Sequence, residues 1–225
     1  FLISEGLKEY YQKQYPDVKF KVLLHSFNMA KATKYEGLPL NRDKIIITFL
    51  GSLNDSNIDS FNFAVNVLRK RNDIVLTVIS SMPKRYFEKI MLPCDNFIIK
   101  SNVSEDQLMG ELRKSHFLLL PHGFNGKLNA IEYQTIFPTR TIQYLFSGVP
   151  ILAILPCGCY LHRVLYNGNC AFCVVQESED DLLKIIDSNM NKKDAIDLVV
   201  NNAINISDQF LTTNVLYVFK KIMGL

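Results

Sequence analysis

The sequence lacks several features that would point to a membrane, a nucleic acid or a repetitive architecture. No run of about 18 apolar residues occurs, so no transmembrane helix is predicted. The 25 Lys and Arg residues nearly balance the 22 Asp and Glu residues without an arginine-rich run, so the net charge of +3 gives no argument for a nucleic-acid partner. There is also no internal repeat, heptad run or low-complexity segment, which excludes repeat and coiled-coil proteins.

Common phosphate-binding and metal-binding motifs are missing as well. The chain contains neither Gly-x-Gly-x-x-Gly nor a P-loop, which makes an unrelated doubly wound nucleotide or sugar-phosphate enzyme less attractive. An Asp-x-Asp motif, which would hold a metal ion, is also absent. No metal site is therefore predicted.

Cysteines are few and odd in number: Cys94, Cys157, Cys159, Cys170 and Cys173. An α/β chain of this size does not need disulfides, so the odd number favours a reducing compartment. Four of these cysteines form two close pairs that could supply a tetrahedral zinc site. Buried reduced thiols are the preferred interpretation, because the first pair has one intervening residue rather than two and a strand would send Cys170 and Cys173 to opposite faces.

The chain does have enough apolar residues for a substantial core. Its 225 residues are 48% hydrophobic, which predicts one large α/β domain or two small ones. It begins at Phe1 without an initiator methionine or a signal-peptide layout. We therefore expect a piece of a longer protein, which would carry only half of an active site.

Strand and helix patterns alternate along most of the chain. Apolar runs predict buried strands at residues 45–50, 73–80, 96–100, 116–120, 151–155 and 170–175, and helical patterns occur at residues 58–71, 83–91, 104–114, 138–147 and 160–166 and from residue 179 onward. This alternation predicts an α/β fold, a Rossmann-like doubly wound parallel sheet of about six strands with helices on both faces. In such sheets, ligands bind outside the carboxyl ends of the strands, where the strand order reverses.

The two ends of the chain are predicted to differ from this regular part. Ser4 is the expected N-cap of a helix over residues 5–14, and residues 19–24 have the pattern of a strand. A linker at residues 30–42 and a polar loop at residues 121–137 are indicated by composition. We therefore divide the chain into an interdomain helix and strand (1–42), a sheet-forming domain (43–190) and C-terminal helices (191–225).

One stretch, at residues 136–155, has the pattern expected of a ligand-binding end. Pro138 suits the first turn of a helix, and Thr139, Arg140 and Thr141 place two hydroxyls and a guanidinium around the unpaired amides of its start. Such a helix terminus attracts phosphate. Gly148 fits the residue just past the helix, and the apolar run that follows is typical of a strand covered on both faces.

The order of these pieces resembles the donor-binding half of a GT-B glycosyltransferase, particularly the retaining enzymes of glycosyltransferase family four. The resemblance covers nearly the whole chain and is carried by residues 3–11, 22–28, 49–53, 117–121 and 137–150. In the last of these, FPTRTIQYL followed by GVP resembles the family's P-[ST]-K-x-x-E-Y-L-x-x-G-x-P block. It implies that residues 43–190 form a nucleotide-sugar-binding domain, the C-terminal domain of the GT-B fold.

The resemblance also implies where a nucleotide diphosphate sugar would lie. The base would be held near the loop from Lys100 to Val103 and the ribose by Gln143. The pyrophosphate would meet Gly51 and Ser52 and the helix start at Thr139 and Thr141, with Arg140 as its cation. Fixed amides, a helix dipole and a guanidinium can stabilise a departing diphosphate, so no metal or other cofactor is expected.

Further residues are assigned around the sugar. His122 and Gly123 follow a strand at its carboxyl end and could face the donor sugar; a solvated loop is an equally good interpretation of His122. Arg140 and Glu132 are the candidate catalytic residues.

Some positions depart from the family's pattern. Glutamine stands at Gln143 where relatives have a glutamate, and it offers one acceptor oxygen to the ribose instead of two. The second acidic residue of the family would fall on Thr135, although Glu132 is close in sequence. The loop after Gly51 also lacks the family's arginine and lysine. A degenerate, non-catalytic glycosyltransferase-like binding module is therefore the alternative.

The partners follow from the same resemblance. We expect a nucleotide-sugar donor, an acceptor held by a missing N-terminal domain, and no nucleic acid. The expected location is cytoplasmic, and peripheral association of the full-length protein with the inner face of a membrane is left open.

Overall fold

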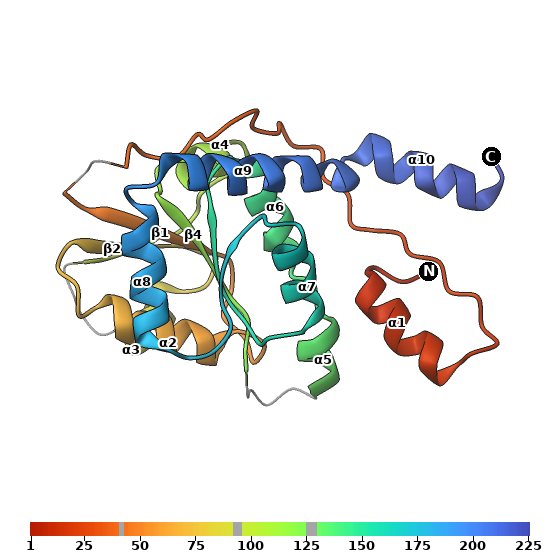
Figure 1. The fold of residues 1–225 in the computed structure, drawn as a ribbon, viewed down its shortest axis with the longest axis horizontal. Coiled ribbons are helices and arrows are strands. Elements are labelled where there is room, and N and C mark those ends of the chain that lie inside the picture. The colour runs from red at the N-terminus through yellow and green to blue at the C-terminus, as the bar shows by residue number, and fades with distance from the viewer. Residues whose placement is uncertain (41–42, 92–95, 125–129) are drawn as a thin grey trace.

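The computed structural model describes residues 1–40, 43–91, 96–124 and 130–225, and its centre is a six-stranded parallel sheet (Figure 1). The strands are β1 (Ile45–Leu50), β2 (Ile74–Ile79), β3 (Phe97–Lys100), β4 (Phe117–Pro121), β5 (Ile151–Ile154) and β6 (Phe172–Val174). They lie in the order β3-β2-β1-β4-β5-β6, and every neighbouring pair is parallel. The predicted doubly wound α/β fold is confirmed, and the strand order reverses between β1 and β4.

Helices cover both faces of the sheet. They are α1 (Glu5–Gln14), α2 (Ile58–Leu68), α3 (Lys84–Met91), α4 (Glu105–Leu112), α5 (Ala130–Thr135), α6 (Thr139–Ser147), α7 (Tyr160–Asn167), α8 (Glu179–Asn189), α9 (Lys193–Ser207), the 3-10 turn η1 (Asp208–Phe210) and α10 (Thr212–Met223). Figure 1 shows α2, α3 and α8 on one side of the strands, α6 and α7 on the other, and α9 across the top of the view, where it contacts α6 and α8.

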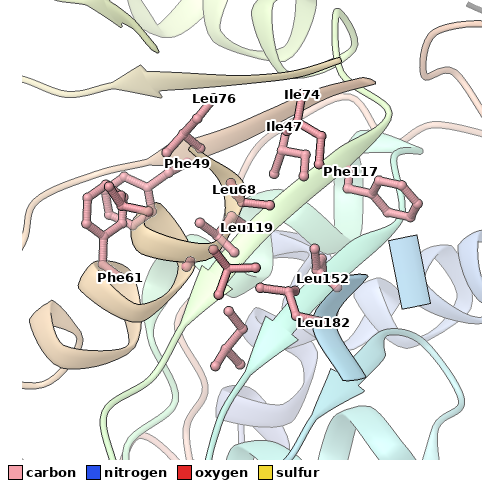
Figure 2. Packing of buried hydrophobic residues seen from close by; sticks show 14 of the residues in the cluster. Ile47, Phe49, Phe61, Leu68, Ile74, Leu76, Phe117, Leu119, Leu152 and Leu182 are labelled. Carbon is pink, nitrogen blue, oxygen red and sulfur yellow. The ribbon is translucent and has the colours of Figure 1, made fainter. Parts of the chain in front are cut away.

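The core is divided by the sheet because successive strand residues point to opposite faces. On one face, Phe49 and Phe117 pack with Phe61 of α2 and Leu182 of α8, as Figure 2 shows. On the other face, alternate residues of β4 and β5 pack against α4, α6 and α7. All four residues of β5 are fully buried, which is why its sequence is a continuous apolar run.

The structure corrects three local predictions. Residues 19–24 do not form a strand, because Val22 makes only an isolated bridge to Leu2. The polar loop predicted over residues 121–137 contains the short helix α5. Pro138 is the N-cap of α6 with extended backbone angles, not a residue of its first turn. In contrast, Gly148 ends α6 with a φ of 76°, the left-handed conformation that glycine adopts readily.

The N-terminal and C-terminal segments pack beside one another at one end of the molecule. Phe27 forms an isolated β-bridge with Leu211, the residue before α10. The ring centroids of Phe1 and Phe219 lie 6.3 Å apart. In Figure 1, α10 extends away from the sheet with α1 below it. The predicted domain boundaries after residues 42 and 190 stay predictions. Among the residues that the structure describes, no helix is both long enough and apolar enough to cross a membrane.

Candidate functional site

The candidate site lies where the strand order reverses, at the carboxyl ends of β1 and β4. Three segments meet there: the loop over residues 51–57 after β1, residues 122–124 after β4, and the N-terminus of α6. A crevice outside this point of a doubly wound sheet is the general ligand position of such folds. The geometry of each segment decides what this edge can bind.

Arg140 joins α6 to the end of β1. Its Nη2 donates a hydrogen bond of 3.0 Å to the Ser52 carbonyl, and its Cζ lies 4.9 Å from the centroid of the Phe49 ring. A Cβ atom placed on Gly51 would stand 3.3 Å from that Cζ, so the guanidinium packs directly against the glycine. The structure therefore brings together three of the predicted site residues, Arg140, Gly51 and Ser52.

The charge of Arg140 is not neutralised within the described part of the chain. No carboxylate there forms a salt bridge with it, and its Nη1 is buried without a hydrogen-bond partner. Burial lowers the pKa of the guanidinium below its usual range, yet arginine remains protonated in proteins. A partly buried cation with an unused donor is suited to an anion.

Free backbone donors lie on the two segments that this arginine joins. The Gly51 amide is already used, because it donates to the Ile79 carbonyl at 2.8 Å and continues the pairing of β1 with β2. The Ser52 amide has no partner among the described residues, and neither do the amides of Thr139 and Arg140 at the start of α6. Beside Gly51, the free backbone donor within the described chain is thus the Ser52 amide.

The hydroxyl of Thr141 adds another unused polar atom near the helix start. Its Oγ1 is fully buried and has no hydrogen-bond partner among the residues that the structure describes, while its amide donates to the Pro138 carbonyl at 2.9 Å. Buried polar atoms in this state are uncommon in folded proteins. Within the described ranges, the helix start therefore carries two amides and one hydroxyl without partners.

The loops after β1 and β4 are tied to each other by hydrogen bonds. Gly123 donates its amide to the Ser56 carbonyl at 2.6 Å, and the Tyr133 hydroxyl donates to the Asp55 carbonyl at 2.6 Å. The Phe124 amide donates to Asp59 Oδ2 at 2.9 Å. These bonds hold residues 51–57 and 122–124 in place without a ligand. We call these two segments the rim of the switch point, the place where the strand order reverses between β1 and β4.

His122 belongs to this rim and is not a solvated loop histidine. It is 1% exposed, its amide donates to the Ile154 carbonyl at 2.8 Å, and its carbonyl accepts from Ser60 Oγ at 2.6 Å. Its Nε2 lies 2.8 Å from the Tyr133 carbonyl, so this nitrogen carries the proton and donates. Burial is the main cause of a lowered pKa, which keeps the imidazole neutral at pH 7.

The other predicted residues make no hydrogen bond or salt bridge with Arg140 in the described chain. Lys100 Nζ pairs with Glu111 Oε2 of α4 at 2.6 Å, and Val103 packs against the core on that side of the sheet. Gln143 is half-buried, and its side chain makes no hydrogen bond within the described chain. Glu132 is exposed on α5, whereas Thr135 is buried with its hydroxyl donating to the Ile131 carbonyl at 2.8 Å. No contact in the described structure joins these residues to the guanidinium.

Two residues at the site were not predicted as functional. Phe49 lies under the guanidinium, and Tyr144 bridges the strands: its hydroxyl accepts from the Leu50 amide at 2.8 Å and donates to the Leu119 carbonyl at 3.1 Å. The sequence contains one signal for the role of Tyr144. It follows Arg140 by four residues, and residues four apart share one face of a helix.

The four described cysteines are free thiols, and three of them are at least partly buried. Among the described cysteines, Cys159 and Cys170 are buried, Cys173 is half-buried, Cys157 is exposed, and all four are free. Burial raises the pKa of Cys170 and of Cys173 to about 12, so both remain protonated at neutral pH. No group of three or more metal-ligating side chains occurs in the ranges that the structure describes, and Cys94 lies outside them.

Solved GT-B glycosyltransferases share this fold. WaaG, a glycosyltransferase involved in lipopolysaccharide biosynthesis, is 16% identical with a TM-score of 0.65, and the match covers 100% of this chain and 62% of WaaG. Sucrose-phosphate synthase from Thermosynechococcus elongatus is 10% identical with a TM-score of 0.74, covering 99% and 57% of the two chains. TarM from S. aureus, solved in complex with UDP, is 13% identical with a TM-score of 0.69, covering 100% and 43%.

These similarities concern the fold. No family model matches the chain, and no curated protein sequence does either. The chain spans 62% or less of the length of these three solved structures. It has the fold of one part of a GT-B glycosyltransferase.

Proposed function

We propose that this chain is the nucleotide-sugar-binding half of a glycosyltransferase of the family-four type. The observation that carries the proposal is the Arg140 guanidinium, which lies at the switch point without a carboxylate partner in the described chain and has a buried, unpaired Nη1. The free amides of Ser52 and Thr139 lie on the two segments that this arginine joins. Together they offer a cation and two backbone donors to a diphosphate.

The chemistry of sugar transfer requires such a site. The nucleotide diphosphate leaves with its bonding electron pair and gains negative charge in the transition state. Donors that are already oriented, in a partly buried place, stabilise that charge without reorganising. Arg140 and the amides would do this directly, and no metal or other cofactor is part of the proposal.

The remaining parts of the donor are assigned by the family resemblance. Gln143 would bind the ribose, the backbone of residues 100–103 the base, and Gly123 the sugar. His122 would hold the rim in place as a neutral, buried group, and Glu132 would serve as the acidic residue. The acceptor would be held by an N-terminal domain outside this chain, and transfer would retain the anomeric configuration.

The setting is part of the same proposal. A cytoplasmic enzyme would receive its donor from solution, and the full-length protein would associate peripherally with the inner face of a membrane if its acceptor is a lipid. TarM has been solved with UDP, which makes uridine diphosphate the first donor fragment to test.

A binding module without catalysis is the second candidate, and one observation favours it. The Thr135 position, where relatives carry an acid, is buried and its hydroxyl is bonded to the Ile131 carbonyl. Gln143 also lacks the second carboxylate oxygen of a glutamate. A module of this kind would bind a nucleotide and transfer nothing.

Calorimetric titration with uridine, guanosine and adenosine diphosphates and their sugars tests the proposal. We expect saturable binding of one nucleotide, weakened about 10- to 100-fold in Arg140→Ala, because charged hydrogen bonds contribute about 1.5–3 kcal/mol. Arg69→Ala is the matched control, since Arg69 follows the far end of α2 and the variant removes the same charge. No binding to any nucleotide would overturn both candidates, and equal binding by Arg140→Ala would overturn the phosphate placement.

A further inference from the structure

The Tyr144 hydroxyl occupies the point at which β1 and β4 separate. Their pairing ends at Phe49 opposite Leu119, whereas β1 continues alongside β2 to Leu50 and β4 continues alongside β5 to Pro121. Beyond the last pair, the Leu50 amide donates to the hydroxyl at 2.8 Å and the hydroxyl donates to the Leu119 carbonyl at 3.1 Å. One side-chain oxygen thus replaces the direct link between the two central strands.

Tyr144 and Arg140 act on the same short segment of chain. They lie one turn apart on one face of α6. Arg140 contacts Phe49, Gly51 and Ser52, and Tyr144 contacts the intervening Leu50. Four consecutive residues at the end of β1 are therefore held by two side chains of one helix.

This arrangement determines the distance between the two sets of free amides. The Ser52 amide belongs to the segment that follows β1, and the Thr139 amide belongs to the first residue of α6, the helix that carries Tyr144. Tyr144 is fully buried, so its ring cannot move without disturbing the core around α6. Without the hydroxyl, the Leu50 amide and the Leu119 carbonyl would lack this partner, and the end of β1 would be free to shift against α6.

Ser52, Thr139 and Arg140 together form what we call the anion site. We propose that Tyr144 is the positioning residue of this site. It holds the loop after β1 at the distance from α6 at which these three residues can bind one diphosphate together. The inference rests on the proposed nucleotide-binding function. Tyr144 itself touches no ligand, and it acts through the strand end that it holds.

Tyr144→Phe tests this role with Tyr35→Phe as the matched control. Both tyrosines donate a hydroxyl hydrogen bond to a backbone carbonyl, Tyr35 to Leu38 at 2.5 Å, and burial raises the pKa of each to about 12. The Tyr35 bond lies in the segment that precedes β1. Each variant removes one oxygen atom and retains the ring, so both are expected to fold.

Affinity for the tightest-binding of uridine, guanosine and adenosine diphosphate is the first measurement. We expect Tyr144→Phe to weaken binding about 5- to 20-fold and Tyr35→Phe to leave it within 2-fold, in line with the loss of one to two hydrogen bonds at the site. Amide exchange at Leu50 should be at least about 10-fold faster in Tyr144→Phe alone. In Arg140→Ala, adding Tyr144→Phe should cause little further loss, because the two residues act on one site.

The outcomes separate this proposal from the one on which it rests. If the unaltered chain binds no nucleotide, the proposed function fails and the positioning role fails with it. If it binds and Tyr144→Phe binds equally well, only the positioning role is refuted. Equal weakening by Tyr35→Phe would also refute it, because the effect would then follow from general stability.

Discussion

Replacing Gly51 by alanine should damage both the backbone and the placement of Arg140. Gly51 has a φ of +110°, a region that L-residues rarely adopt. The new Cβ would also stand 3.3 Å from Arg140 Cζ and 3.5 Å from Nη1. The guanidinium is held by Phe49 and by the Ser52 carbonyl, so it cannot withdraw without losing a contact. We expect Gly51→Ala to lower the free energy of unfolding by about 1–3 kcal/mol.

Two other glycines separate the causes of that loss. Gly158 has a φ of +78°, and an added Cβ atom would meet nothing within 4 Å, so Gly158→Ala measures backbone strain without a new contact. Gly110 lies inside α4, also with nothing within 4 Å, and Gly110→Ala should stabilise the protein by about 0.5–1 kcal/mol. We expect Gly51→Ala to lose more stability than Gly158→Ala.

Urea unfolding followed by circular dichroism measures these differences, and a change of 1 kcal/mol corresponds to a shift in Tm of roughly 2–4 °C for a chain of this size. The decisive comparison is Gly51→Ala in an Arg140→Ala background, where its cost should fall to that of Gly158→Ala. If Gly51→Ala proves as stable as the unaltered protein, the close packing of the guanidinium on the glycine is wrong.

Two further predictions concern stability away from the site. The buried His116 accepts a hydrogen bond of 2.8 Å from the Ile46 amide at its Nδ1. His116→Phe should therefore lower the free energy of unfolding in urea by about 1–3 kcal/mol. An unchanged urea midpoint would show that this bond is unimportant. Hydrogen bonds from Lys100, which has the larger effect, and from Lys114 lower the pKa of Glu111 below 4.5. The stability that ionised Glu111 gives to the folded protein is therefore fully present well above pH 4.5 and is lost as the pH falls through the pKa of Glu111 in the folded state. Glu111→Gln should lose less than about 1 kcal/mol at pH 7 and show a shallower fall in stability between about pH 5 and 3; an identical pH profile would contradict the pairing.

The sheet could be predicted because its signals are local and repeated. The apolar runs at β1, β2, β4 and β5 are each bounded by turns and followed by helical spacing, and their parallel pairing follows from that alternation. Residues 19–24 have the same local pattern, but a strand also requires a neighbour, and here only Leu2 is available. The six residues of α5 are too few to show a helical period.

The site was predictable only in part for a similar reason. A proline followed by Thr139 and Arg140 indicates a helix start, and this start does meet the loop after Gly51. Which amide of that loop is free depends on the last bond of β1 to Ile79, and this pairing cannot be read from the loop itself. A buried aromatic such as Tyr144 has the pattern of packing, and its polar role becomes visible only when Leu50 and Leu119 are placed beside it.

The strand order has a consequence for how the protein is made. β2 can pair with β1 once both are synthesised, but Phe117, the β4 partner of Ile47, follows 70 positions later. At a synthesis rate of about 5–20 residues per second, one edge of β1 waits roughly 4 to 14 seconds for its neighbour. Arg140 and Tyr144 emerge later still. Closure of the sheet and assembly of the anion site therefore both wait for the second half of the chain, and a variant that slows this stage would expose the central strand to misassociation.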